Sequence, residues 1–269
     1  MTEFKFEKGY THGGVFHADD VFATAFLTML NPNFEVERGF KPPVDDESII
    51  VYDIGNGKFD HHSEPRECRA KNGKYYAAFG KLWREYANLI VSDFIKDRVD
   101  NDFVQIIDEC DNTGESNLLS TCIYAFNPTW QDERSSSDEK FAKAVEIAKA
   151  ILENIIDKYK SAEYARKEVL EYYAKSKDGL VIMDRYAPWE DALDEEINAN
   201  RVKAIVFPSL RGGWNIERIE DSGFEFPKDW WGTREEKVKG LLFCHASGFM
   251  CNFKELQDIL DIVELCKKK

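Results

Sequence analysis

Four of the five histidines fall within the first 62 residues, each close to an aspartate or a glycine-rich turn. His12 and His17 flank such a turn, which leads into Asp19, and the run Asp60-His61-His62 follows later. Neutral imidazole is the commonest protein ligand of metal ions, and carboxylates are the natural co-ligands of a hard divalent ion. The joint spacing therefore predicts a divalent metal site in the N-terminal part of the chain.

Two further carboxylates, those of Asp53 and Asp111, are expected to complete this site. Asp53 ends a short apolar run, Ser48 to Tyr52, which predicts a buried parallel strand, and open α/β sheets place their sites at the carboxyl ends of strands. Taken singly, each of these residues also has a structural interpretation, such as a turn former or an acid at the start of a helix. The predicted metal ligands are His12, His17, Asp19, Asp53, His61 and Asp111.

The elements that must position these residues alternate between helix and strand. A turn and then a helix are predicted over Tyr10 to Asn31, and two helical segments over Ala77 to Cys110. A long amphipathic helix is predicted from Ser136 to Lys175, with a capping box at its start and a break near Ser161 left open. The second helical segment is predicted to bury Ile95, Val99, Phe103, Ile106 and Cys110 on one face.

The C-terminal part has a different composition and predicts a second, smaller domain. Strands are expected over 179–183, 203–207, 214–219 and 241–244, and helices over 189–198 and 252–268. The predicted fold class is α/β, with a mainly parallel sheet flanked by helices in the N-terminal domain. The predicted domains are residues 1–135, a helical connector over 136–177, and an α/β domain over 178–269.

Composition limits the class of partner. The chain has 36 basic and 50 acidic residues, a net charge of −14, which argues against a broad non-specific polyanion-binding face. The longest apolar stretches are too short for a membrane span, so no membrane partner is expected. The six cysteines form no CxxC pair, which favours reduced thiols over a disulfide framework. We expect a cytoplasmic protein.

Six motifs follow one another along nearly the whole chain: Thr11 to Asp20, Val51 to Gly55, Phe59 to His62, Asp108 to Gly114, Asn127 to Trp130, and Phe243 to Phe249. This series resembles that of the MYG1 family, which is related to the DHH phosphoesterases. The resemblance implies hydrolysis of phosphate esters with two Mn²⁺ or Mg²⁺ ions, and catalytic roles for Asp19, Asp53, His61 and His62. His17-Ala18-Asp19 replaces the usual D-x-D of the DHH group, and the added imidazole favours Mn²⁺, Fe²⁺ or Zn²⁺ over Mg²⁺. The predicted cofactor is two divalent ions, with manganese first.

Substrate contacts are predicted from both domains. His62 is expected to contact the scissile phosphate, and His245 with the amides of a turn before a helix is expected to receive a substrate phosphate. Arginine and tryptophan together suit phosphate binding and base stacking, although a solvated loop and core aromatics are the structural alternative. The predicted substrate-binding residues are His62, Arg66, Arg211, Trp214, His245, Ser247 and Gly248, with Arg69, Lys71, Lys74 and Arg218 as further candidates.

The favoured function is a metal-dependent phosphodiesterase or exonuclease acting on short single-stranded nucleic acid or nucleotides. A small substrate suits an acidic protein better than duplex binding does. Two alternatives stay open: a small-molecule phosphohydrolase, such as a pyrophosphatase or nucleotide phosphatase, and a non-catalytic metal-binding or nucleotide-binding protein. Homo-oligomer formation also stays open, as do the cleavage polarity and the choice between RNA and DNA.

Overall fold

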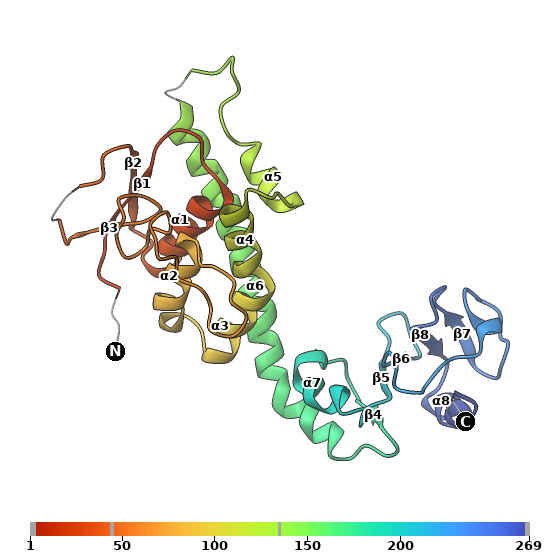
Figure 1. Cartoon of the computed structure of the whole chain (residues 1–269). Coiled ribbons are helices and arrows are strands. Elements are labelled where there is room, and N and C mark those ends of the chain that lie inside the picture. The colour runs from red at the N-terminus through yellow and green to blue at the C-terminus, as the bar shows by residue number, and fades with distance from the viewer. Residues whose placement is uncertain (1–3, 44–45, 134–135, 267–269) are drawn as a thin grey trace. The chain divides into compact units, whose positions relative to one another are not determined.

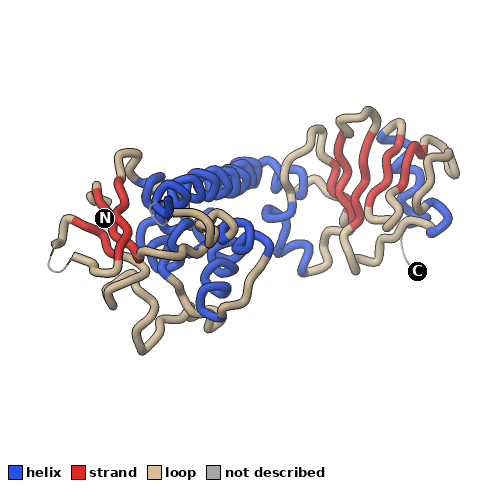
Figure 2. Tube along the Cα trace, turned by 90° about the horizontal axis from the view of Figure 1, so that it is seen from above, coloured by secondary structure: helices blue, strands red, loops and turns tan. Residues whose placement is uncertain are grey.

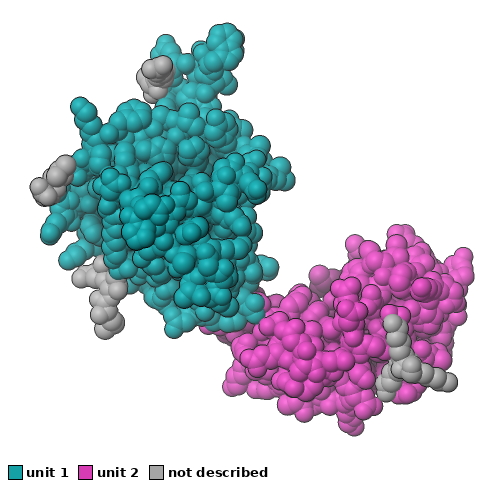
Figure 3. Space-filling model, viewed as in Figure 1, with its two compact units in different colours: residues 1–160 teal, residues 161–269 magenta. Residues whose placement is uncertain are grey.

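A computed structural model describes residues 4–43, 46–133 and 136–266 of the chain. The chain divides into two compact units, Met1–Lys160 and Ser161–Lys269 (Figure 3). Each unit holds one sheet with helices beside it, as Figure 2 shows. Both parts are therefore of mixed α/β composition, which confirms the predicted fold class. In the described residues, every helix is too short or too polar to cross a membrane.

The sheet of the first unit is parallel throughout, as predicted. Its strands are β1 (Lys8–His12), β2 (Glu35–Gly39) and β3 (Ile49–Val51), in the order β2-β1-β3 (Figure 1). The prediction missed β1, where a turn was expected over its last residues. Only Tyr10 and Thr11 in its sequence are strand formers, and the central position of β1 comes from its two neighbours.

The helix predicted after the first turn is the centre of this unit. It is α1 (Ala18–Leu30), whose first ten residues are all buried, and it packs against α2, α4 and α5. The other helical segments of this unit lie between Ala78 and Tyr124. They are α2 (Ala78–Tyr86), η1 (Ala87–Leu89), α3 (Asp93–Val99), η2 (Asp100–Val104), α4 (Gln105–Thr113) and α5 (Leu118–Tyr124).

A π-helical turn, η2, corrects the predicted apolar face of the second helical segment. The wider turn inserts an extra residue and shifts the helical phase that follows it. Ile106, predicted to be buried, is 44% exposed, and Ile107 is 1% exposed in its place. The predicted end of the segment is confirmed, because Gly114 caps α4 with a left-handed φ of 74°.

The long helix is confirmed as α6 (Ser137–Tyr173), and it runs through Ser161 without a break. The predicted capping box is wrong. The Ser136 hydroxyl donates to the Glu133 carbonyl, and the Glu139 carboxylate pairs with Lys143 instead of reaching back to the helix start. The division between the two compact units falls inside α6.

The sheet of the second unit has the order β4-β5-β6-β8-β7; β4 and β5 are parallel and the other pairs antiparallel. The predicted closing helix over 252–268 begins later than expected. Its first two residues, Asn252 and Phe253, instead belong to a strand that pairs with both β6 and β7. The elements are β4 (Leu180–Ile182), α7 (Glu190–Asn198), β5 (Ala204–Pro208), β6 (Trp214–Arg218), η4 (Lys228–Trp230), β7 (Leu241–Cys244), β8 (Met250–Phe253) and α8 (Leu256–Cys266).

Candidate metal centre

The carboxyl ends of β1 and β3 bring the first two site residues together. Tyr10 of β1 is in register with Val51 of β3, and His12 and Asp53 lie two residues further along each strand. His12 Nε2 is 3.3 Å from Asp53 Oδ2. Asp53 has a left-handed φ of 58°, which is uncommon outside glycine, asparagine and aspartate and turns the chain sharply where β3 ends.

Two adjacent aspartates enter from the start of α1. The Asp19 carboxylate accepts hydrogen bonds from the backbone N–H groups of Ala78 and Phe79, at 3.0 and 2.9 Å, and is thereby held at the N-terminus of α2. Asp20 Oδ1 accepts the N–H of His17 at 2.8 Å. This bond directs Asp20 Oδ2 towards His12 Nε2, which lies 3.4 Å away.

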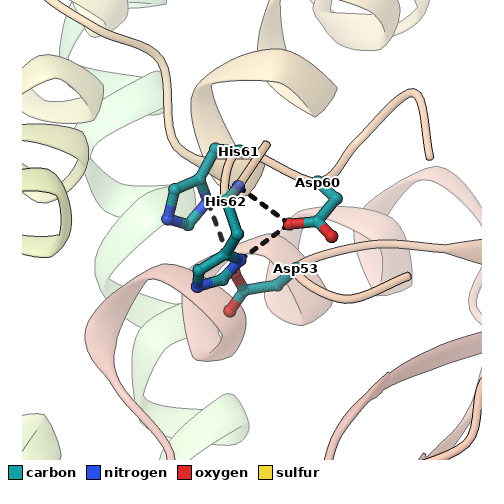
Figure 4. Close-up of side chains that lie close together, drawn as sticks. All are labelled: Asp53, Asp60, His61 and His62. Carbon is teal, nitrogen blue, oxygen red and sulfur yellow. Dashed lines mark hydrogen bonds and ion pairs between the residues drawn. The ribbon is translucent and has the colours of Figure 1, made fainter. Parts of the chain in front are cut away.

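The loop after β3 and the last turn of α4 complete the cluster. His61 Nε2 is 2.8 Å from Asp111 Oδ2, and its Nδ1 is 3.4 Å from Asp53 Oδ1. Asp60 contacts the next histidine along the chain: its Oδ1 is 2.7 Å from His62 Nδ1 (Figure 4). The His61 side chain is 6% exposed and that of His62 is 60% exposed, so the two rings have different surroundings.

These side chains form three overlapping groups in which the ligand atoms lie within 4.8 Å of one another. All three groups contain Asp53. A carboxylate has two oxygens with several lone pairs and is the natural group to be shared between adjacent cation sites. The groups are His12, Asp20 and Asp53; Asp19, Asp53, His61 and Asp111; and Asp53, Asp60, His61 and His62.

The electrostatics of the cluster reflect this crowding of acids. Burial lowers the pKa of His12, but its hydrogen bond to Asp53 and the charge of Asp20 outweigh burial and raise the pKa to about 9. Burial raises the pKa of Asp20 to about 7, against the opposing charge of His12. Burial and the nearby Asp53 and Asp111 charges hold the pKa of Asp19 well above its usual range. The site thus gathers more negative charge than its own histidines neutralise.

Three buried polar atoms in the cluster lack a hydrogen-bond partner among the described residues: Asp20 Oδ2, Asp53 Oδ1 and His61 Nδ1. Buried polar atoms of this kind are rare in folded proteins and call for a bound ion or water. Two are carboxylate oxygens and one is an imidazole nitrogen, the donor set that a borderline divalent cation accepts. The residues therefore fit a divalent metal ion.

The cluster opens on a cavity of about 1000 Å³. His17, predicted as a ligand, is exposed and lines this cavity, with its ring centroid 5.8 Å from that of His12. His62 also lines the cavity. The other wall is formed by residues of α4, α5 and the loop between them, including Cys110, Glu115, Ser116, Ser120, Thr121 and Tyr124.

One predicted substrate contact of the first unit is corrected. Arg69 is 4% exposed, and its guanidinium donates to Asp100 and to the fully buried Asp108 at 2.7 Å each. It is therefore an internal ion-pair residue. Gly80 allows this arrangement, because a Cβ at that position would lie 1.9 Å from Asp108 Oδ2. Arg66 remains a surface residue, 3.5 Å from Glu64.

The remaining predicted substrate residues, Arg211, Trp214, His245, Ser247 and Gly248, belong to the second unit. The turn that contains His245 is not the start of a helix, because it joins β7 to β8 in an antiparallel hairpin. His245 Nδ1 lies 2.9 Å from the Ser247 hydroxyl. Gly248 has a φ of 64°, and a Cβ there would lie 2.2 Å from the Trp231 ring, so close packing requires this glycine.

The predicted ligand set omits Asp20 and Asp60. Their sequence signals were present, since Asp20 follows Asp19 and Asp60 precedes His61. A helix turns by about 100° per residue, so adjacent aspartates at the start of a helix do not normally face one site. They do so because Asp19 is held by α2 while Asp20 caps its own helix and reaches His12.

Comparison with known proteins relates this chain to one group over almost its full length. A MYG1 protein of Saccharomyces cerevisiae is 24% identical, over 95% of this chain and 94% of its own. The MYG1 exonucleases of Mus musculus and Homo sapiens are 23% and 24% identical, each over 89% of this chain and over 79% and 80% of their own.

The structure of RecJ from Thermus thermophilus, solved in complex with Mn²⁺, aligns with a TM-score of 0.31 and 10% identity, over 96% of this chain. This chain spans about half of that RecJ chain, 51%.

The family model MYG1_exonuc, described as an uncharacterised protein family (UPF0160), matches residues 9–267. This match takes in both compact units and every residue of the metal-ligand groups. The chain therefore belongs to the MYG1 (UPF0160) family.

Proposed function

We propose that this chain is a divalent-metal-dependent phosphodiesterase that acts as an exonuclease on short single-stranded nucleic acid. The observation that supports this proposal most is a set of buried ligand atoms on Asp20, Asp53 and His61 that lack a hydrogen-bond partner among the described residues, beside a cavity open to substrate. The mammalian relatives are named exonucleases. A short strand end suits a protein with a net charge of −14.

Two ions would share the Asp53 carboxylate in this proposal. His12, Asp20 and Asp53 would hold one ion, and Asp19, Asp53, His61 and Asp111 the other. Bound divalent ions supply a lowered pKa for an attacking water and positive charge for the phosphate oxygens. Manganese is the proposed ion, because a site with two or more imidazoles favours it over Mg²⁺.

The chain's own groups prepare the reaction. Backbone N–H groups at the start of α2 fix Asp19, and the N–H of His17 fixes Asp20, so the ligand oxygens are held before any ion arrives. Preorganised ligands lose little conformational entropy on binding. His62 is exposed to the cavity, and its Nδ1 faces Asp60 Oδ1. Its Nε2 is the atom we assign to contact the scissile phosphate and to deliver a proton to the leaving oxygen.

Metal analysis followed by product analysis tests this function. Protein purified without chelator should contain up to two Mn²⁺ per chain, and should release mononucleotides from short single-stranded oligonucleotides when Mn²⁺ is present. Cleavage of pyrophosphate but not of oligonucleotides would replace the proposal with a small-molecule phosphohydrolase. Metal binding without turnover of either substrate would make the chain a binding protein. His245, Arg211 and Trp214 stay proposed substrate contacts, tested by the same assay.

A further inference from the structure

The cavity extends beyond the metal-ligand groups to a wall with a different chemistry. Of the described residues that line it, none is lysine or arginine. Positive charge for a phosphate is therefore available only at the histidine and metal-ligand end. The lining also includes Val15 and Tyr124, together with the hydroxyl-bearing Ser120 and Thr121, none of which belongs to a metal-ligand group. This part of the lining, which also contains the Glu115 carboxylate, suits an uncharged, flat group with polar edges better than a second phosphate.

Tyr124 is the aromatic residue of this wall, at the C-terminal end of α5. It is 53% exposed, and Val15 on the loop after β1 is 49% exposed. Among the described residues, no aromatic ring packs on the Tyr124 ring and no side chain hydrogen-bonds to its hydroxyl. A half-exposed aromatic ring on the wall of a substrate cavity is the kind of surface on which nucleic-acid bases stack.

Asn127 fixes the loop that contains Val15 against the end of α5. Its Oδ1 accepts the N–H of Phe16 at 2.9 Å, and its Nδ2 donates to the Phe16 carbonyl at 2.8 Å. The same Nδ2 donates to the Tyr124 carbonyl at 3.0 Å. Arg38 adds a second attachment of the loop, with Nη2 3.0 Å from the Gly14 carbonyl. One side-chain amide thus joins the two surfaces that contain Val15 and Tyr124.

We propose that Val15 and Tyr124 bind the base of the nucleotide whose phosphate is cleaved, and that Asn127 is the positioning residue that holds them. The inference rests on the proposed function for the position of the phosphate at the metal-ligand end. Stacking on an aromatic side chain discriminates little between bases, so all four bases should be accepted. It typically improves binding by about ten- to a hundredfold for each base.

Calorimetric binding of two probes tests the base site without turnover. With Mn²⁺ present, the wild-type protein should bind AMP about ten- to a hundredfold more tightly than ribose 5-phosphate, which lacks the base. Tyr124→Ala should bring the two Kd values to within about twofold by weakening AMP alone, and Tyr124→Phe should keep the preference. Trp130→Ala is the matched control, because Trp130 is 92% exposed in the following loop and does not line the cavity.

The ratio of the Kd values for ribose 5-phosphate and AMP also tests the positioning role of Asn127. Asn127→Ala should reduce the preference for AMP over ribose 5-phosphate while leaving the bound Mn²⁺ and the affinity for ribose 5-phosphate unchanged. Asn127→Asp keeps the acceptor for Phe16 N–H but loses the donor, and should give an intermediate ratio. A variant that weakens both probes equally would assign Asn127 a general structural role and overturn this part of the proposal.

Failure of the base site and failure of the proposed function give different results. Equal affinities of the wild-type protein for AMP and ribose 5-phosphate would overturn the base site even if oligonucleotides are hydrolysed. A preference for AMP that depends on Tyr124, in a protein that hydrolyses no phosphodiester, would support the base site and refute the nuclease function. If the enzyme is active, two trinucleotides can be compared, each with an abasic unit at one end. The KM should rise for the trinucleotide that lacks the base at the cleaved end and should not change for the other.

Discussion

Replacing Asp53 with asparagine removes one carboxylate from all three ligand groups at once. Asparagine keeps the size of the side chain and tolerates the left-handed φ of 58° at this position. The backbone N–H of residue 53 still donates to the Phe59 carbonyl. We therefore expect Asp53→Asn to fold and to lose divalent metal binding, with turnover falling to the background rate.

The size of the effect follows from mass action. At a free Mn²⁺ concentration of about 100 Kd, the binding of a single ion stabilises the wild-type protein by about 2.7 kcal/mol. For a unit of the size of Met1–Lys160 this raises Tm by about 5 to 11 °C. Changes in groups that merely orient metal ligands weaken binding by up to about 100-fold, and loss of a shared ligand should reach at least that. At the same Mn²⁺ concentration, metal binding would then stabilise the variant by only about 0.4 kcal/mol and raise its Tm by about 1 to 2 °C.

Differential scanning calorimetry with and without Mn²⁺ measures this difference directly. Asp221→Asn is the matched control, because Asp221 is exposed, also has a left-handed φ, of 55°, and lies in the second unit. The control should retain the full Mn²⁺-dependent rise in Tm. An Asp53→Asn protein that shows the wild-type rise would refute the shared-ligand reasoning, because a residue common to every group could then be lost without effect.

Three further predictions concern single side chains. Asp20→Asn keeps an acceptor for the N–H of His17 but removes one charged ligand of the His12 group, and should lower the Mn²⁺ content from two ions to one per chain by atomic emission; an unchanged content would contradict the two-ion assignment. Arg69→Ala leaves Asp108 buried without its counter-ion and should cost about 3 to 5 kcal/mol of unfolding free energy in urea, whereas the exposed Arg66→Ala should cost less than about 1 kcal/mol. His245→Ala should raise KM about ten- to a hundredfold without changing bound Mn²⁺, and unchanged kinetics would assign the β7–β8 turn a structural role only.

Local periodicity determines several elements of this chain. The helical spacing of apolar residues predicts α1 and α6, and the apolar run before Asp53 predicts β3. The ligand types and their places next to turns predict the metal centre, because the carboxyl ends of parallel strands meet at one edge of a sheet. The predictions of α1, α6 and β3 are confirmed because they depend on neighbours within a few residues, whereas the metal centre stays a prediction.

Other features depend on partners that are distant along the chain. β1 is a strand because β2 and β3 supply its hydrogen bonds, and β8 is a strand because β6 and β7 do the same. The helical phase after Asp100 changes at a π-helical turn, which reverses the burial of Ile106 and Ile107. A periodicity argument assumes a constant turn and cannot locate such a change.

The amino-acid sequence by itself determined which chemical groups the N-terminal unit offers, a set of imidazoles and carboxylates spaced for a divalent cation. The tertiary structure decided which of them meet. It buries Arg69 against Asp108 and brings Asp20 to His12, although the sequence pattern treats Arg69 as a surface cation and Asp20 as an acid at a helix start. The physical reason is that burial and ion pairing are set by the packing of α1, α2 and α4, and this packing involves residues dozens of positions apart.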